Sequence, residues 1–376
     1  MPIYKQKEKN KDGVYKYKVR VNYTDSFGNH KQLTRTAWGA REAKELERQL
    51  TQQTDSRSIT TGITLSTLFS EYCNSIQHEI RQTSLEKKQS IFKLHIEPVL
   101  GSKQLTHLNT KTLSDWKTYI NEKGLRLQTR KNLYTEFRAL LNYAVKMEYL
   151  STNPLLKVGN FRDAYEEKSE IQFYTPEEFK LFRDAALITA EQTGYYDYYV
   201  FFCIAYYTGA RKGEIHALRW SSIDSDYFSI KKSITQKLKG GDVETPPKNK
   251  SSIRTIQIPL PLMKILTEHK SRQQKAVLSI GQKWSEDGFI CGYYKSLRDS
   301  SLENENIKYA KASQQKKIRI HDFRHSHASL LINNGINALE IARRLGHSTV
   351  EQTLKTYSHL FPKESERALE ILNSIE

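Results

Sequence analysis

The sequence has little cysteine and no long apolar run. Its 376 residues include 3 cysteines, Cys73, Cys203 and Cys291. They are isolated, odd in number and not spaced as metal ligands, which argues against a disulfide framework or a zinc site and favours a reducing cytoplasm. No window approaches the roughly 18 apolar residues of a membrane span, and the N-terminus lacks a secretory signal pattern. We therefore expect a cytoplasmic protein that is neither membrane-bound nor exported.

Acidic residues are outnumbered by basic ones. Lys and Arg total 59 against 42 for Asp and Glu, which gives a formal net charge of +17 spread along the chain. A basic surface gains affinity for a phosphate backbone by releasing counterions, and no basic amphipathic helix favours a membrane instead. Nucleic acid is therefore the expected partner. The P-loop sequence G-x-x-x-x-G-K-[ST] is also absent, so no nucleotide cofactor is expected.

The first 56 residues predict a small sheet with a helix beside it. From Tyr15 to Tyr23 apolar and aromatic residues alternate with Lys16, Lys18 and Arg20, which is typical of a half-buried strand. The other strands and the helix are expected over residues 2–7, 30–36 and 40–53. The face with Lys16, Lys18 and Arg20 is expected to be exposed, either as a solvated surface or as a DNA-binding site.

Polar linkers divide the rest of the chain. Residues 51–62 and 157–173 are rich in polar or charged side chains and are expected to connect domains. Between them, apolar residues three and four apart predict a compact helical domain. Its helices are expected over residues 65–76, 84–99, 110–122 and 128–147. The predicted domains are residues 1–56, 63–156 and 174–376.

The last domain is predicted to combine helices with a little sheet. Thr175 and Glu178 form a capping-box pattern at a helix start, and residues 198–207 are apolar on all sides, which is typical of a buried helix. Strands are expected over 227–237 and 252–258, flanking a polar segment. The fold class is therefore multidomain and mainly α with small β-sheets, with an α+β third domain.

Four segments of this domain carry residues suited to chemistry on a phosphate. They are Ala210-Arg211-x-x-Glu214, His321-x-x-Arg324, Leu345-Gly346-His347 and the segment around Tyr357. Each residue alone has an ordinary structural interpretation, and Tyr357 is one of 22 tyrosines. Three histidines between residues 321 and 327 suggest a metal, but no H-E-x-x-H pair is present, so no metal is expected.

In combination these residues suit phosphoryl transfer on DNA. Arginine forks bind non-bridging phosphate oxygens bidentately and neutralise the charge of a five-coordinate transition state, which requires no metal. A phenol, with a pKa of about 10, must lose its proton near that positive field with help from an imidazole. Gly346 is expected to end one helix, and Ser348 with Glu351 to form a capping box for the next.

In order and spacing these segments resemble the motifs of the tyrosine recombinase (phage-type integrase) family. The similarity is close over about residues 175–376, while the helical segment resembles the family's core-site-binding domain. Residues 1–56 resemble the arm-site-binding domain of phage and conjugative-transposon integrases. The resemblance implies an enzyme that cuts and rejoins DNA without metal, ATP or another cofactor.

The resemblance also implies partners and residue roles. Double-stranded DNA attachment sites would be bound by a homotetramer in a prokaryotic nucleoid, with an excisionase and a host DNA-bending protein as possible partners. Arg211 and Arg324 would clamp the scissile phosphate, His321 and His347 would donate hydrogen bonds and assist proton transfer, and Glu214 would orient Arg211.

Tyr357 would be the nucleophile and would form a 3′-phosphotyrosine intermediate. The family's general-acid lysine lies in a β-hairpin between the first arginine and the His-x-x-Arg motif. The matching stretch is 247–254, in which Lys248 aligns best and Lys250 is the alternative.

Two other functions would suit parts of the same pattern. A non-catalytic helix-turn-helix regulator would use residues 323–345, which accounts for the charge and the helices but not for Arg211, His347 and Tyr357. A dimer resolvase or a relaxing topoisomerase would keep the chemistry, but residues 1–56 suit a second DNA site. Integration and excision of a mobile element such as a prophage is therefore the favoured function.

Overall fold

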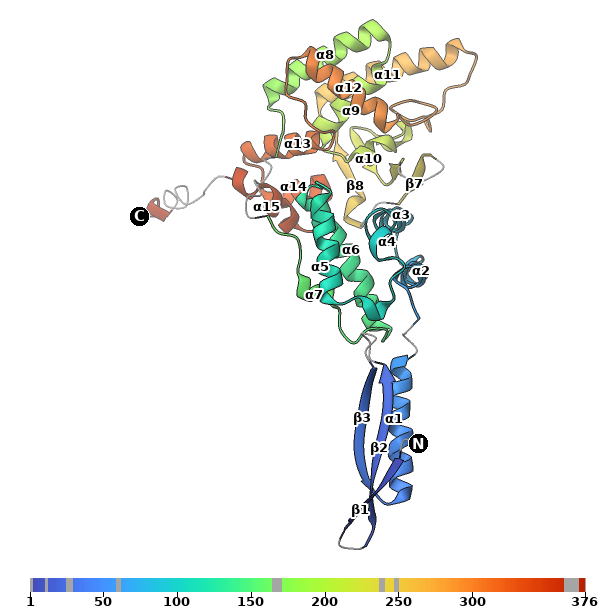
Figure 1. The fold of residues 1–376 in the computed structure, drawn as a ribbon. Coiled ribbons are helices and arrows are strands. Elements are labelled where there is room, and N and C mark those ends of the chain that lie inside the picture. Colours follow the sequence, from blue (N-terminus) through green and yellow to red (C-terminus); the bar gives the residue numbers. More distant parts are fainter. Residues whose placement is uncertain are drawn as a thin grey trace. The chain divides into compact units, whose positions relative to one another are not determined.

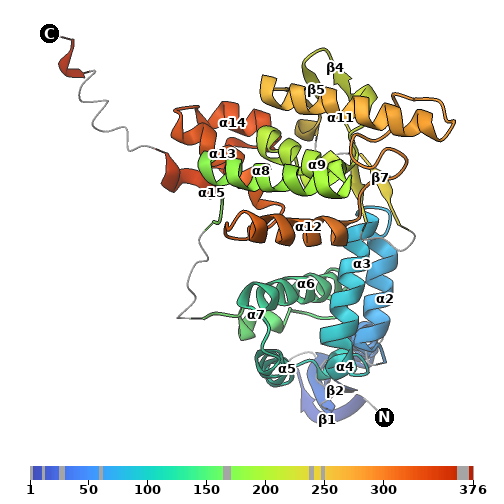
Figure 2. The same ribbon diagram turned by 90° about the horizontal axis from the view of Figure 1, so that it is seen from above.

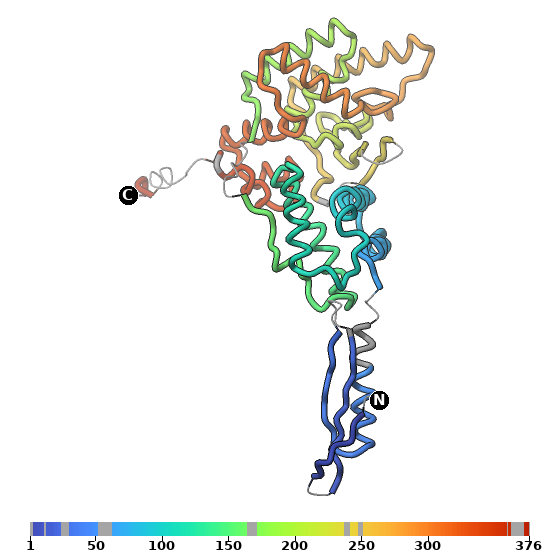
Figure 3. The backbone as a smooth tube through the Cα atoms, in the orientation of Figure 1, coloured from blue at the N-terminus to red at the C-terminus, as the bar shows by residue number. Residues whose placement is uncertain are grey.

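The computed structural model describes residues 3–10, 13–24, 30–58, 62–163, 171–236, 241–246, 250–361 and 372–375. At residues 24, 52–58, 250 and 359 it describes the backbone alone. Internal contacts divide the chain into two compact units, residues 1–168 and 169–376. The course of the backbone through each unit can be followed in Figure 3.

The first unit begins with a three-stranded antiparallel sheet in the order β1-β2-β3. Its strands are β1 (Ile3–Lys9), β2 (Tyr15–Thr24) and β3 (His30–Trp38). Helix α1 (Ala40–Ser58) lies along the sheet, as Figure 1 shows, and Val19 of β2 is fully buried in the core between them. The predicted strands and helix are confirmed. However, the linker predicted from residue 51 is wrong as far as Ser58, because no glycine or proline interrupts the helix there.

A helical module follows in the same unit. Its longer helices are α2 (Leu65–Ile76), α3 (Gln82–Ile91), α5 (Thr110–Glu122) and α6 (Leu127–Lys146), with the short helices α4 (Glu97–Leu100) and α7 (Leu155–Val158). They pack around the buried rings of Trp116 and Phe137. The predicted helix over 84–99 passes through a π-helical turn at Phe92–Ile96. Pro98 explains this turn, because it has no N–H and its ring excludes the carbonyl four residues earlier.

The second unit is built around α9 (Tyr196–Thr208), which is buried from Tyr199 to Tyr206 and at Thr208, as predicted for most of this segment. It contacts α8 (Pro176–Thr193), α11 (Leu260–Ser279) and α13 (Asp322–Asn333), and α12 (Asp299–Ala312) packs beside α8 (Figure 2). The predicted capping box is present at the start of α8, where Thr175 and Glu178 bond each other's backbone N–H. Gly209 ends α9 in a left-handed conformation, at φ 63°.

Two small antiparallel sheets lie in this unit. Strands β4 (Ile223–Asp224), β5 (Tyr227–Ile230) and β8 (Arg254–Gln257) form the first, and β6 (Ser233–Thr235) pairs with β7 (Val243–Thr245) in the second. The single strand predicted over 227–237 is therefore wrong, because Lys231 and Lys232 leave one sheet before the chain enters the other. The expected strand over 252–258 is confirmed as β8, and the short helix α10 (Lys212–His216) packs against β6.

The C-terminal helices are α14 (Ala338–Leu345) and α15 (Val350–Tyr357), followed by the 3-10 turn Ser358–Leu360. Gly346 ends α14 at φ 69°, as predicted. The capping box predicted for Ser348 and Glu351 is wrong, because Thr349 is the N-cap residue of α15 and the Ser348 hydroxyl instead accepts a bond from Gln352. The expected fold class, mainly α with small sheets, is confirmed. None of the helices in the described ranges has the length and apolarity to span a bilayer.

Candidate active site

The buried carboxylate of Glu214 fixes the position of Arg211. Arg211 follows the left-handed turn at Gly209 and is the N-cap residue of α10, while Glu214 lies one turn later. The Arg211 backbone N–H donates to Glu214 Oε2 at 2.9 Å, and its Nη1 donates to Oε1 at 2.8 Å. Nη2 donates to the Gly346 carbonyl at 3.0 Å. The guanidinium therefore links its own motif to the predicted motif that contains Gly346.

A second arginine, Arg254 of β8, binds the same carboxylate and was missed in the sequence. Its Nη2 lies 2.8 Å from Glu214 Oε2 and its Nη1 lies 3.2 Å from Oε1. Nε donates to the Arg344 carbonyl at 2.7 Å, and the side chain is 7% exposed. Burial alone would raise the pKa of Glu214, but Arg254 and Arg211 outweigh it and hold this pKa below its ordinary value. The carboxylate is therefore charged.

Arg324 of α13 is buried, with an exposed fraction of 3%. Its Nη1 donates to the Gly209 carbonyl at 2.9 Å, whereas its buried Nη2 has no hydrogen-bond partner among the described residues. Burial, together with the nearby charges of Arg211 and Arg254, lowers the pKa of Arg324 to about 9. A buried donor without a partner beside other cations is strongly attractive to an anion, because binding would relieve both the unmet hydrogen bond and the repulsion.

The two predicted histidines lie near these arginines. His347 sits between α14 and α15, and its Nδ1 lies 2.7 Å from the Thr353 hydroxyl. Burial, with Arg324 and Arg211, lowers its pKa to about 4. His321 precedes α13, and the residue as a whole is exposed. Surrounding protein atoms nevertheless desolvate its ring, which lowers its pKa to about 4 as well. Both imidazoles are thus neutral at neutral pH and can each donate one N–H.

Tyr357 ends α15 and is 2% exposed. It packs against apolar residues that include Ile332 and Leu345. Its hydroxyl lies 2.6 Å from Nδ1 of His325, a residue not singled out in the sequence. Burial raises the pKa of Tyr357 to about 12 despite the opposing charge of Arg324. The phenol is therefore protonated at neutral pH. Because His325 follows Arg324 directly in α13, the hydrogen bond to His325 places the tyrosine beside the arginine cluster.

The candidate general-acid lysines lie in a segment whose side chains the structure does not describe. Lys248 is not among the described residues, and only the backbone of Lys250 is described, in a 3-10 turn just before β8. The ranges with assigned side chains contain no cluster of three or more histidines, cysteines or carboxylates able to hold a metal ion. The structure therefore brings together Arg211, Glu214, Arg324, His321, His347 and Tyr357. The side chains of Lys248 and Lys250 are not among those it describes.

The missed residues had a partial sequence signal. Arg254 is two residues before Ile256 and four before Ile258, so strand alternation puts it on the face that these buried isoleucines occupy. A charged residue on a buried face needs a partner, which Glu214 supplies. His325 is one helical turn after His321, and their rings are 5.3 Å apart. Neither pattern identified the partner residue, because it lies far away in the sequence.

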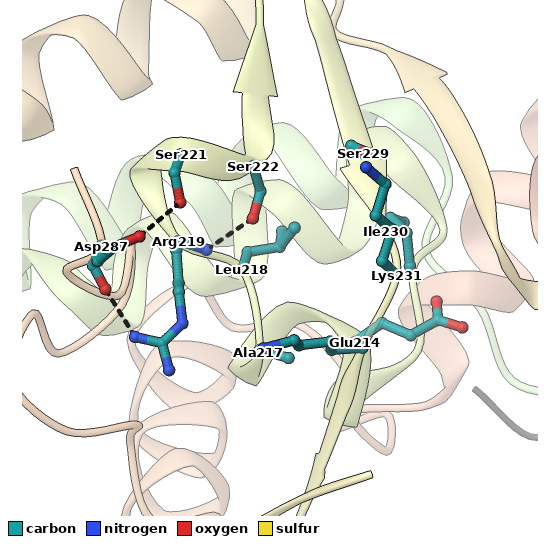
Figure 4. A pocket seen from close by; sticks show the side chains of 11 residues that line it. Glu214, Ala217, Leu218, Arg219, Ser221, Ser222, Ser229, Ile230, Lys231 and Asp287 are labelled. Carbon is teal, nitrogen blue, oxygen red and sulfur yellow. Dashed lines mark hydrogen bonds between the residues drawn. The ribbon is translucent and has the colours of Figure 1, made fainter. Parts of the chain in front are cut away.

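A cavity of about 460 Å³ lies beside α10 and contains part of Glu214 in its wall. Figure 4 shows that the polar groups lining it bond one another, with Arg219 donating to the Asp287 carbonyl and Ser221 to the Asp287 carboxylate. The carboxylate of Glu214 points away from Arg219. The cavity is therefore not the place where the arginine cluster would receive a phosphate.

The basic face of the N-terminal sheet is less open than predicted. Lys16 forms an ion pair with Glu8 at 2.9 Å and lies over the ring of Trp38. Arg20 lies over the ring of Tyr4, with its guanidinium 5.2 Å from the ring centre. Lys16, Lys18 and Arg20 are all partly buried, because side chains of β1 and β3 flank them on the sheet. The expectation of a fully exposed face is corrected accordingly.

An α+β domain that gathers two arginines, two histidines and a tyrosine in this way is suited to the transfer of phosphoryl groups. Comparisons with known proteins agree. The model of the phage integrase family matches residues 173–364, and that of the phage integrase N-terminal SAM-like domain matches residues 64–122. The chain therefore belongs to the phage integrase family, and it is a tyrosine-type site-specific recombinase that integrates mobile elements.

Individual relatives fit this assignment. The chain is 30% identical to the ICEBs1 integrase of Bacillus subtilis over 98% of its own length and 99% of that protein. It is 28% identical to a XerC-like tyrosine recombinase of Caldanaerobacter subterraneus, over 68% of each chain. Among solved structures, it resembles the Tn1549 transposon integrase in complex with transposon right end DNA, with a TM-score of 0.64, 19% identity and coverage of 81% of this chain and 98% of that one.

A similar fold spans almost the whole chain in a second solved structure. A lambda integrase tetramer bound to a Holliday junction matches with a TM-score of 0.56 at 17% identity, and the match covers 97% of this chain and 95% of that one. The comparisons give no support to a non-catalytic regulator.

The shared carboxylate predicts a coupled pair of substitutions. Arg254→Met leaves Glu214 buried with one of its two cations missing, and we expect the free energy of unfolding to fall by about 3–5 kcal/mol. Glu214→Gln in the same chain removes the buried charge that has lost Arg254, so the double variant should lose clearly less than the sum of the two single losses. Urea unfolding of the full chain measures all three.

Arg343→Met is the matched control, because Arg343 is 69% exposed and lies 3.8 Å from Glu340 in a surface pair. We expect it to change the free energy of unfolding by no more than about 0.5 kcal/mol. Equal losses for Arg254→Met and Arg343→Met would show that the Glu214 pair is not a stabilising element.

Proposed function

We propose that Tyr357 is the nucleophile that cuts and rejoins DNA at the attachment sites of a mobile element. Its oxygen attacks the scissile phosphorus, the bond to the 5′-oxygen breaks, and a 3′-phosphotyrosine remains. A 5′-hydroxyl of another strand later attacks this linkage and releases Tyr357. Because the phosphodiester energy is kept in the covalent intermediate, rejoining needs no ATP.

The observation that carries this proposal is the buried Nη2 of Arg324, which has no partner among the described residues and lies beside other cations. We assign Arg324 and Arg211 to the non-bridging oxygens of the scissile phosphate. A phosphate there would receive charge-assisted hydrogen bonds from both guanidinium groups. The neutral imidazoles of His321 and His347 would donate further bonds as charge develops in the transition state. Glu214 acts through Arg211 as a positioning residue.

Lys248 is our candidate for the general acid that protonates the leaving 5′-oxygen, with Lys250 as the alternative. The basis is the family resemblance and the position of both residues just before β8. Strand β8 follows this lysine segment in the sequence, and Arg254 at the start of β8 bonds Glu214. The lysine segment is therefore joined directly to the arginine cluster. A short tether of this kind would let the lysine reach the same phosphate.

The domain roles follow from the same assignment. We propose that residues 174–376 carry out the chemistry, that residues 63–156 bind the core site, and that residues 1–56 bind an arm site. Exchange between two duplexes uses four active sites, so a homotetramer on DNA is the proposed assembly. A small excisionase and a host DNA-bending protein are proposed partners in a prokaryotic cell. An arm-binding module favours this function over a dimer resolvase or a relaxing topoisomerase.

The nucleophile can be tested by trapping. The full chain is incubated, in EDTA and without ATP, with a nicked duplex that carries the attachment site, and covalent adducts are separated on a denaturing gel. We expect an adduct with the wild-type chain and none with Tyr357→Phe, because phenylalanine has no oxygen to form the bond. Tyr195→Phe is the matched control, since Tyr195 is 65% exposed, and it should form the adduct normally. An adduct with Tyr357→Phe, or dependence on a divalent metal, contradicts the proposal.

The proposed arm site is tested by salt dependence. Lys18 lies on β2 on the same side as Lys16 and Arg20, facing away from the buried valines. Lys18→Ala should weaken binding to arm-site DNA and reduce the slope of log K against log salt by about 1, as expected for one lost phosphate contact. Lys44→Ala, on the exposed surface of α1, should leave the slope unchanged. Equal slopes for both variants would exclude Lys18 from the interface.

A further inference from the structure

His325 is in direct contact with the reacting atom of the proposed nucleophile. The hydroxyl of Tyr357 and Nδ1 of His325 are 2.6 Å apart, and the two rings meet at 62° with centroids 5.5 Å apart. The two candidate histidines named by the family resemblance make other contacts. Nδ1 of His347 bonds the Thr353 hydroxyl, and no hydrogen bond joins His321 to Tyr357 within the described ranges.

The burial of Tyr357 makes this contact chemically significant. At 2% exposure the phenol cannot pass its proton directly to bulk water. The apolar side chains of Ala328, Ile332 and Ile341 pack in the same cluster, and within the described ranges the Tyr357 hydroxyl forms a hydrogen bond with Nδ1 of His325 alone. Nδ1 of His325 is therefore the group placed to receive it. Nδ1 has a free lone pair when the ring is neutral with its proton on Nε2.

We propose that His325 is a catalytic residue of this enzyme, the general base that accepts the phenolic proton during DNA cleavage. This role rests on the proposed function of Tyr357 as the nucleophile. As the Tyr357 oxygen bonds to phosphorus, its proton passes to Nδ1 of His325 and an imidazolium forms. The bond between phosphorus and the 5′-oxygen breaks, and this leaving oxygen takes a proton from the general acid. In rejoining, His325 returns the proton to the departing phenolate. No oxidant, metal or other co-reactant takes part.

The groups that face His325 set its protonation state. Burial lowers its pKa from the ordinary 6.5, and Arg319 and Arg324 lower it further, while Asp322 opposes them. The ring of His321 packs edge-on against it from the preceding helical turn, and Tyr357 contacts it from α15. His325 is therefore neutral at neutral pH. The hydroxyl, whose pKa is raised, transfers its proton only as the bond to phosphorus forms and makes that oxygen far more acidic.

Two substitutions separate proton transfer from simple positioning. In His325→Asn the side-chain oxygen can still accept the hydrogen bond of Tyr357 but cannot hold the proton. In His325→Phe both abilities are lost. We expect both variants to bind attachment-site DNA as the wild type does and to form the covalent adduct at least about 100-fold more slowly in single-turnover reactions. If His325 only positions Tyr357, His325→Asn will cleave at close to the wild-type rate, which overturns the proposal.

The pH profile gives an independent readout. In the wild type, the cleavage rate should fall in the acid range, at a pH below the ordinary imidazole pKa of 6.5, because His325 becomes protonated there and can no longer accept a proton. This fall should be absent in His325→Asn over the same range. A fall that persists unchanged in the variant assigns the titration to another group and overturns the proposal.

A sulfur substrate distinguishes the base from the acid. When the scissile 5′-oxygen is replaced by sulfur, the leaving group departs without protonation, so Lys248→Ala should recover its cleavage rate. His325→Asn should not, since Tyr357 still has to lose its proton. Recovery of His325→Asn would place His325 at the leaving group and contradict the inference. Absence of an adduct with the wild-type chain on both substrates, or its formation by Tyr357→Phe, would instead refute the proposed function.

Discussion

The buried Glu214 carboxylate is the interaction on which the rest of the site depends. It binds Arg211 on one side and Arg254 on the other, and each arginine continues to a backbone carbonyl near Gly346. Three segments distant in sequence are thereby fixed to one another: the start of α10, strand β8 and the end of α14. Gly346 is part of the same packing, because a Cβ there would lie 2.9 Å from Arg254 Nη1. One negative charge therefore organises a site that is otherwise positive.

The cluster is electrostatically incomplete. Two arginines share one carboxylate, and a third, Arg324, is buried beside them with its pKa lowered to about 9. Burial, together with the same field, lowers the pKa of His347 to about 4, so it gains no charge near neutral pH. A phosphodiester would supply the missing negative charge, and more negative charge develops in the transition state. A preorganised cationic site of this kind stabilises the transition state more than the ground state.

The sequence predicted much of this arrangement, for reasons that can be stated. Apolar periodicity located α2 and α5 at their observed bounds, and the all-apolar run marked α9 as buried. The motif residues were found because a tyrosine recombinase needs those residue types in that order. The contacts of Arg254 and His325 could not be predicted, because their partners Glu214 and Tyr357 are 40 and 32 residues away in sequence and meet them only through the packing of separate elements. The capping box at Ser348 failed because the neighbouring Thr349 is the N-cap residue instead.

If the arginine cluster acts by neutralising charge on the scissile phosphate, the loss of Arg324 must matter only while that charge is present. Single-turnover adduct formation is compared for the wild type and Arg324→Ala on two nicked attachment-site duplexes, one with an ordinary scissile phosphate and one with a methylphosphonate that lacks its negative charge. Arg324→Ala should be slower by about 100-fold or more on the phosphate. On the methylphosphonate it should approach the wild-type rate, because little charge remains to be neutralised. An equal defect on both substrates would contradict the account and leave Arg324 with a structural role.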